Sequence, residues 1–190
     1  MNLPNKLTVV RLIVIPFFLI LMVIPFHWGA VTFWGATIPV SQLIAAILFI
    51  AATITDNLDG QIARRQHLVT NFGKFTDPLA DKLLVMTAFI VMTGSGVVPA
   101  WVTTIIIWRE LAVTGLRLLI VEQNGQVLAA KMPGKIKTTT QFIAIIFLLL
   151  NNVIFAMWGI PFGQIMLYIC LFFTVYSGVD YFVKDRKSVV

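Results

Sequence analysis

Residues 56–81 read DNLDGQIARRQHLVTNFGKFTDPLAD, a charged stretch with four aspartates between two strongly apolar segments. SQLIAAILFIAATIT (41–55) precedes it, and KLLVMTAFIVMTG (82–94) follows it. Two apolar helices joined by a short hairpin would bring all four carboxylates to the same end of the molecule. The rest of the sequence must explain why a chain this apolar gathers so much charge in one place.

The composition is that of an integral membrane protein. Of the 190 residues, 59% are hydrophobic and only 12% are charged, and the mean hydropathy is +0.94. Soluble domains are roughly 45–50% apolar and about 25% charged. An ordinary soluble domain is therefore excluded. The single cysteine, Cys170, lies in an apolar run and cannot form an internal disulfide.

Six apolar segments approach the roughly 20 residues that a helix needs to cross a bilayer. They are 7–26, 39–62, 76–94, 98–121, 135–156 and 161–183. We expect an all-α integral membrane fold with six transmembrane helices, in one domain over residues 1–190. The first eight residues, MNLPNKLT, are expected to form a short segment at the membrane interface.

The basic residues predict the orientation of these helices. Lysines and arginines lie near both termini and around the second and fourth connections, whereas the first, third and fifth connections have none. The positive-inside rule places both termini and the second and fourth connections in the cytoplasm. Trp28, Trp34, Trp101 and Trp158 lie near the opposite side, as in an aromatic belt. Topology explains the basic pI of about 9.8, so no nucleic-acid partner is expected.

The spacing of the aspartates predicts two carboxylate pairs. Asp56 and Asp59 are neighbours on one helix face, and Asp77 and Asp81 are one turn apart, about 6 Å along a helix axis. A carboxylate at membrane depth costs at least roughly 2.5–3.5 kcal/mol, which a divalent cation would offset. All-oxygen ligands suit Mg²⁺, Mn²⁺ or Ca²⁺, and bound metals suit a pyrophosphate substrate. The alternative is a solvated loop with salt bridges.

The small residues of the same stretch have two interpretations. Gly60, Ala63 and Gly73 can let a ligand approach the backbone closely, or they can let helices pack closely in a membrane. Their position between the aspartates favours ligand contact.

The complete pattern resembles a family signature. D-x-x-D-G-x-x-A-R, eight residues, then G-x-x-x-D-x-x-x-D resembles the signature of the CDP-alcohol phosphatidyltransferase family, and every fixed position is matched. The resemblance implies a six-helix bacterial inner-membrane enzyme that releases CMP and uses two divalent ions, Mg²⁺ or Mn²⁺. It implies metal ligation by Asp56, Asp59, Asp77 and Asp81, with Asp81 also the general base. It implies contacts of CDP-diacylglycerol with Asp59, Gly60, Ala63, Arg64 and Gly73.

The acceptor alcohol is predicted from cations elsewhere in the chain. A phosphorylated acceptor would use the positive charges of Arg109, Arg117, Lys135 and Lys137. The alternatives are the positive-inside bias for the lysines, and a structural ion pair for Arg109. Glu110 need not be the partner in that pair, because adjacent helix positions do not face each other well.

Three further motifs resemble one bacterial branch of the family, which transfers a phosphatidyl group from CDP-diacylglycerol to sn-glycerol 3-phosphate. They are NLPNKLTVVR (2–11), RELAVTGLR (109–117) and GKIKTTTQ (134–141). The resemblance implies phospholipid synthesis, with membrane lipids as surroundings and a homodimer as a compatible assembly. Inositol phosphate remains an alternative acceptor. An intramembrane prenyltransferase and a cation transporter are the competing classes, which the clustering of all four aspartates in one hairpin disfavours.

Overall fold

The structure contains six α-helices within the residues that it describes. The computed structural model describes residues 3–65, 71–122 and 132–189, with side chains except at 3–9, 56–65, 71–79, 81, 117–122, 133 and 182–189. The helices are α1 (Leu3–Val23), α2 (Val40–Arg65), α3 (Asn71–Gly94), α4 (Ala100–Glu122), α5 (Met132–Leu149) and α6 (Phe162–Val189). The prediction of six helices is confirmed over these residues.

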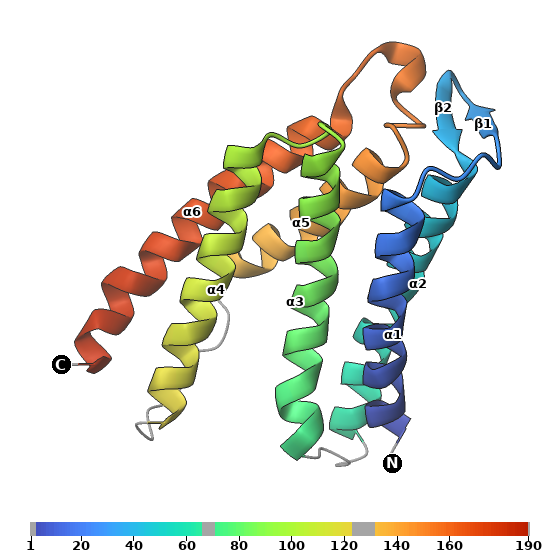
Figure 1. The fold of residues 1–190 in the computed structure, drawn as a ribbon. Coiled ribbons are helices and arrows are strands. Elements are labelled where there is room, and N and C mark those ends of the chain that lie inside the picture. The colour runs from blue at the N-terminus through green and yellow to red at the C-terminus, as the bar shows by residue number, and fades with distance from the viewer. Residues whose placement is uncertain (1–2, 66–70, 123–131, 190) are drawn as a thin grey trace.

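The helix ends fall at two opposite ends of the molecule (Figure 1). The start of α1, the end of α2, the start of α3 and the end of α4 lie at the lower end in that view. The start of α4 and the connection between α5 and α6 lie toward the opposite end. Helix α1 packs on α2 and α3, and α6 packs on α4 and α5. This arrangement agrees with the alternation of basic and uncharged connections in the sequence.

One apolar core joins the helices. Each helix contributes at least one side chain that is no more than 1% exposed: Phe18, Phe49, Phe89, Ile106, Ile145 and Leu167, from α1 to α6 in order.

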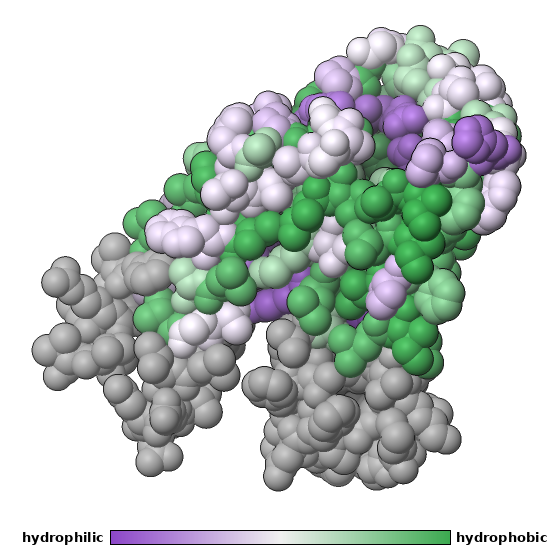
Figure 2. All heavy atoms as spheres, in the orientation of Figure 1, coloured by the Kyte–Doolittle hydropathy of each residue, from purple (hydrophilic) through white to green (hydrophobic). Residues whose placement is uncertain are grey.

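Large apolar side chains also cover the outside of the helices. Phe17, Trp108 and Phe172 are 59%, 70% and 66% exposed. Figure 2 shows a broad hydrophobic band across one face, with hydrophilic residues concentrated at the hairpin end. Among the described residues, Phe162–Tyr181 is long and apolar enough to cross a membrane, and Val10–Val23, Val40–Thr55 and Lys82–Gly94 are shorter apolar helices. A surface this apolar is typical of contact with lipid rather than water.

Threonines within the helices bond to their own helix. Thr87 donates to the carbonyl of Leu83 at 2.7 Å, and Thr139 donates to that of Lys135 at 3.1 Å. The hydroxyl is thereby satisfied without water, as an apolar environment requires.

A β-hairpin between α1 and α2 was not predicted from the sequence. Strands β1 (Ala30–Phe33) and β2 (Ala36–Pro39) pair antiparallel, with Phe33 opposite Ala36. Trp34 and Gly35 form the two-residue turn with φ of 44° and 82°, which matches the turns that suit the twist of a hairpin. The expectation of a purely helical chain is corrected at this point.

Several helix boundaries differ from the prediction, because hydropathy marks only the apolar part of a helix. Helix α2 continues to Arg65, whereas an end at 62 was predicted, and α3 begins at Asn71, whereas a start at 76 was predicted. Helix α1 begins at Leu3, so residues 3–8 continue the first helix. Their location at the membrane interface stays a prediction. Pro4 is compatible with this start, because the first turn of a helix needs no backbone donor there.

Helix α5 ends at Leu149 rather than at 156. Asn151 and Asn152 adopt positive φ, 48° and 56°, a conformation that asparagine tolerates better than most residues and that stops the helix. The 3₁₀ helix η1 (Ala156–Trp158) follows.

The two asparagines connect this end of α5 to three other elements. The Asn151 amide donates to the Thr37 carbonyl of β2 at 2.8 Å, and it accepts a bond from Gln42 of α2 at 3.2 Å. Asn152 Oδ1 accepts the backbone N–H of Gly163, at the start of α6, at 2.6 Å. These bonds hold β2, α2 and α6 against the end of α5.

Replacing Gly163 tests this junction. A Cβ atom at Gly163 would lie 2.9 Å from Asn152 Oδ1 and 3.0 Å from Leu148 Cγ. Because overpacking of this kind costs about 1–3 kcal/mol, Gly163→Ala should lower the midpoint of thermal unfolding in detergent by several degrees. Gly94→Ala is the control, since nothing lies within 4 Å of its added atom. Equal midpoints for the two variants would contradict the prediction.

Candidate functional site

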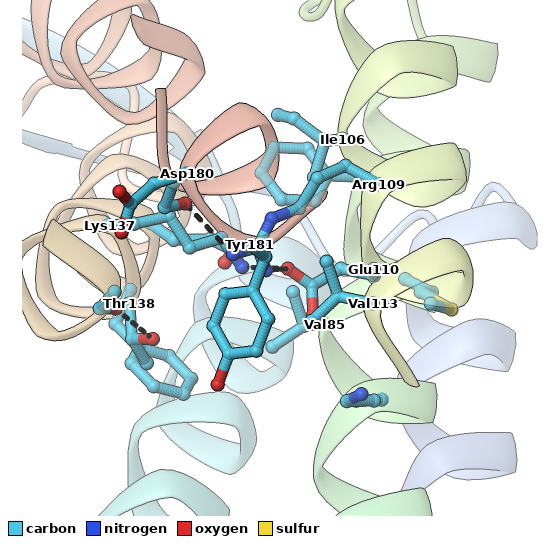
Figure 3. Close-up of a pocket in the computed structure, with 16 residues that line it drawn as sticks. Val85, Ile106, Arg109, Glu110, Val113, Lys137, Thr138, Asp180 and Tyr181 are labelled. Carbon is cyan, nitrogen blue, oxygen red and sulfur yellow. Dashed lines mark hydrogen bonds and ion pairs between the residues drawn. The ribbon is translucent and has the colours of Figure 1, made fainter. Parts of the chain in front are cut away.

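A polar pocket of about 200 Å³ lies between α3, α4, α5 and α6 (Figure 3). Its volume is below the roughly 300–1,000 Å³ of pockets for drug-sized ligands, so it suits a small molecule. Helix α4 contributes Arg109 and Glu110, α5 contributes Lys137 and Gln141, and α6 contributes Ser177. Polar side chains from helices far apart in sequence therefore converge inside an apolar bundle.

A buried ionic cluster forms one wall of this pocket. Lys137 Nζ and Arg109 Nη1 both pair with Glu110 Oε1, the latter at 3.2 Å. Arg109 Nη2 donates to Ser177 Oγ at 2.8 Å. The side chains of Arg109, Glu110 and Lys137 are only 12%, 11% and 5% exposed. Figure 3 shows Arg109, Glu110 and Lys137 directed toward one another. Lys82 and Asp180 add one charge of each sign to the pocket lining, which therefore has three cations and two carboxylates.

The partner of Arg109 differs from the expectation that adjacent helix residues face apart. Both side chains are long enough for the guanidinium to reach the neighbouring carboxylate, and Lys137 of α5 holds that carboxylate from the other side. The structural ion pair considered for Arg109 is therefore present. Glu110 can balance only one positive charge, although both Arg109 and Lys137 pair with it.

Lys82 connects the pocket to the aspartate-bearing helix. It lines the pocket, and its Nζ donates to Thr114 Oγ1 on α4. Thr114 in turn donates to the Glu110 carbonyl at 2.6 Å. Lys82 directly follows Asp81 along α3. The pocket therefore lies beside the helix turn that carries the last aspartate of the motif.

Gly178 makes room for Arg109 on the side of α6. A Cβ atom at Gly178 would lie 3.3 Å from Arg109 Cγ, tighter than an ordinary contact. Arg109 and Gly178 also line an apolar groove of about 250 Å³ between α4 and α6. The aliphatic part of Arg109 thus separates this groove from the polar pocket.

The aspartate motif lies on the ends of α2 and α3. Asp56, Asp59, Gly60, Ala63 and Arg64 belong to α2, and Gly73, Asp77 and Asp81 belong to α3. The predicted helical spacing of both carboxylate pairs is therefore confirmed for the backbone. Their side chains lie outside the described set, in which no group of three or more His, Cys, Asp or Glu could hold a metal. The donor chemistry of four carboxylates fits Mg²⁺ or Mn²⁺.

The four predicted acceptor residues have different outcomes. Arg109 and Lys137 line the same pocket. Lys135 is exposed and is not among the residues that line it. Arg117 belongs to α4, and its side chain lies outside the described set.

Sequence reasoning missed four polar residues that line the pocket: Lys82, Ser177, Asp180 and Tyr181. The signal for Asp180 was a carboxylate within the apolar run of the last helix, which could have been read as a site residue.

Comparison with known proteins gives consistent matches along the chain. The family model described as CDP-alcohol phosphatidyltransferase matches residues 1–176. The chain is 52% identical, over 99% of its length and 97% of the relative, to the CDP-diacylglycerol–glycerol-3-phosphate 3-phosphatidyltransferase of Bacillus subtilis (strain 168). Proteins of the same name from Rickettsia bellii (strain RML369-C) and Salmonella paratyphi A (strain ATCC 9150 / SARB42) are 35% and 33% identical. These two alignments cover 98% and 100% of this chain, and 96% and 97% of the relatives.

A double-mutant cycle tests the buried cluster. Glu110→Gln should lower the free energy of unfolding by about 3 kcal/mol, because it leaves two buried cations without their counter-charge. Adding Lys137→Met removes one of those cations, so the double variant should lose about 1–3 kcal/mol less than the sum of the single losses. Denaturant unfolding in detergent measures all four proteins. Strictly additive losses would show that the pair does not interact.

Proposed function

The chain belongs to the CDP-alcohol phosphatidyltransferase family, and we propose that it transfers the phosphatidyl group of CDP-diacylglycerol to sn-glycerol 3-phosphate, with release of CMP. The observation that carries this proposal is the 52% identity, over nearly the full length of both chains, to a relative named for this activity. The products are phosphatidylglycerophosphate and CMP, and the reaction belongs to phospholipid synthesis.

The pocket between α3 and α6 supports a phosphorylated acceptor. Arg109, Lys137 and Lys82 line it together with two carboxylates, Glu110 and Asp180, so its lining has one positive charge in excess. An acceptor phosphate would balance the remaining positive charge, with arginine able to bind it bidentately. A neutral acceptor such as glycerol would leave that charge without compensation. Arg117 and Lys135, the other two residues predicted to bind the acceptor phosphate, stay predictions.

The aspartate motif is assigned to the donor. Asp56, Asp59, Asp77 and Asp81 would hold two divalent ions, Mg²⁺ or Mn²⁺, and the ions would supply charge neutralisation for the pyrophosphate. Gly60, Ala63 and Gly73 leave space beside the backbone for the nucleotide. Arg64 and Asp59 complete the CDP-diacylglycerol contacts.

Asp81 is assigned as the general base. A carboxylate within hydrogen-bond reach of an alcohol can accept its proton as the oxygen attacks the phosphorus atom. Lys82, the next residue on α3, lines the acceptor pocket, which supports a hydroxyl of the bound acceptor close to Asp81. The attack forms the new O–P bond and breaks the bond to the CMP phosphate.

The proposed function also places the helices in a membrane. We assign all six helices as transmembrane and the aspartate-bearing end to the cytoplasm. The exposed apolar side chains, and the threonines that donate to carbonyls of their own helix, support the location in the membrane. The basic residues at the aspartate-bearing end support the orientation. The lipid donor and the soluble acceptor would then meet at the cytoplasmic boundary.

An acceptor screen tests the proposal. Purified protein with labelled CDP-diacylglycerol and Mg²⁺ or Mn²⁺ should release CMP with sn-glycerol 3-phosphate and form phosphatidylglycerophosphate, whereas glycerol, serine and inositol phosphate should support far less release. Chelation by EDTA should abolish the release, and added metal should restore it. Release with inositol phosphate alone would reassign the acceptor. Absence of release with every alcohol would overturn the transferase function.

Asp81→Asn tests the general base. The amide cannot accept the proton, so turnover should fall by about 10²–10⁴-fold while CDP-diacylglycerol binding is largely kept. Asp185→Asn is the matched control, because Asp185 lies on α6 beyond the region matched by the family model. Steady-state CMP release and equilibrium binding of the lipid separate the two effects. Normal turnover in Asp81→Asn would rule out this role.

A further inference from the structure

Gln141 is a buried polar residue whose amide nitrogen has no described partner. The residue is 3% exposed, and its Nε2 atom makes no hydrogen bond to any group that the structure describes. A buried donor left without an acceptor costs free energy, so such groups are rare in folded proteins. The donor is accounted for if a bound molecule supplies the acceptor atom.

Gln141 lines the polar pocket. Gln141 follows Lys137 by one turn of α5, so the two side chains share one helix face. On the same helix, Thr138 donates to the Gly134 carbonyl at 3.0 Å, and Lys137 pairs with Glu110. Arg109 Nε of α4 is a second buried donor of the pocket without a described partner. Gln141 therefore offers the pocket a donor that these bonds do not use.

The direction of the helices places Gln141 away from Asp81. The pocket lining runs along α3 from Lys82 to Phe89, about 10 Å along the helix axis. Along α5 it runs from Gly134 to Phe142, with Gln141 near the latter end. An acceptor with its reacting hydroxyl at Asp81 would extend its other end toward the inner part of the pocket.

We propose that Gln141 is a specificity-determining residue for the acceptor, and that its Nε2–H donates a hydrogen bond to a phosphate oxygen of sn-glycerol 3-phosphate. This inference rests on the proposed function. Lys137 and Arg109 supply charge to the same phosphate, and Gln141 supplies direction. An alcohol without a phosphate would leave the buried amide unpaired, and sites with such polar groups reject ligands that cannot pair with them.

Two substitutions separate the hydrogen bond from the shape of the side chain. Gln141→Met has similar length and no donor, and it should raise the KM for sn-glycerol 3-phosphate about 10-fold, as expected for a lost bond to a charged group. Gln141→Glu keeps the shape but places a carboxylate beside the phosphate, so the KM should rise further. In both variants the KM for CDP-diacylglycerol should stay within about twofold of wild type.

Thr139→Val is the matched control. Thr139 is an exposed residue of α5 whose hydroxyl bonds to the Lys135 carbonyl of its own helix, and it does not line the pocket. Its kinetic constants should equal those of wild type. Calorimetric titration of each detergent-solubilised protein with sn-glycerol 3-phosphate gives the acceptor affinity without turnover and should show the same order.

The outcomes distinguish this inference from the function on which it rests. Suppose that the wild type is active. If Gln141→Met then has an unchanged KM for the acceptor, or if its KM values for acceptor and lipid rise equally, only the role of Gln141 is overturned. A wild type that releases no CMP with sn-glycerol 3-phosphate overturns the proposed function. If Gln141→Met does not fold, Gln141→Asn withdraws the same amide by one carbon, and an unchanged acceptor KM there would equally overturn the role.

Discussion

The structure depends on a carboxylate shared by two cations inside an apolar bundle. Glu110 of α4 pairs with Lys137 of α5 and with Arg109, which also reaches Ser177 of α6. None of these charges is stable alone in an apolar interior, so each fixes the position of the others. Three helices are thereby held at the distance that leaves a pocket between them.

The cluster also explains how charges of opposite sign can work side by side. The aspartate pairs belong to the ends of α2 and α3, whereas Arg109 and Lys137 belong to α4 and α5. Lys82 lies where the two sets meet, next to Asp81 in sequence and within the pocket. In the proposed function, divalent ions held by the carboxylates would neutralise the pyrophosphate of the donor, and the cations would neutralise the acceptor phosphate. The proposed reaction would use both sets, because a pyrophosphate donor and a phosphorylated acceptor are both anions.

Much of this could be predicted from the sequence, because the relevant signals are local. Apolar runs gave six helices, and helical spacing gave the carboxylate pairs of the motif, now located on α2 and α3. The hairpin was missed because its turn, Trp34 and Gly35, lies in a stretch that reads as an interfacial loop. The end of α5 was missed because Asn151 and Asn152 bond to distant residues that no local pattern reveals. The sequence suggested an ion pair for Arg109, but the pairing of Glu110 with Lys137 of another helix could not be predicted for the same reason.

The difference between Lys135 and Lys137 shows how the third dimension selects among similar signals. Both are lysines at the start of α5, and the positive-inside bias accounts for either. Residues i and i+2 of an α-helix point about 200° apart around the helix axis, so only one of these two lysines can face the bundle. Lys137 does, and Glu110 stabilises it there. Since Glu110 also reduces the net charge, the pocket does not hold every anion by charge alone. Directed donors such as the Gln141 amide can then decide which anion fits.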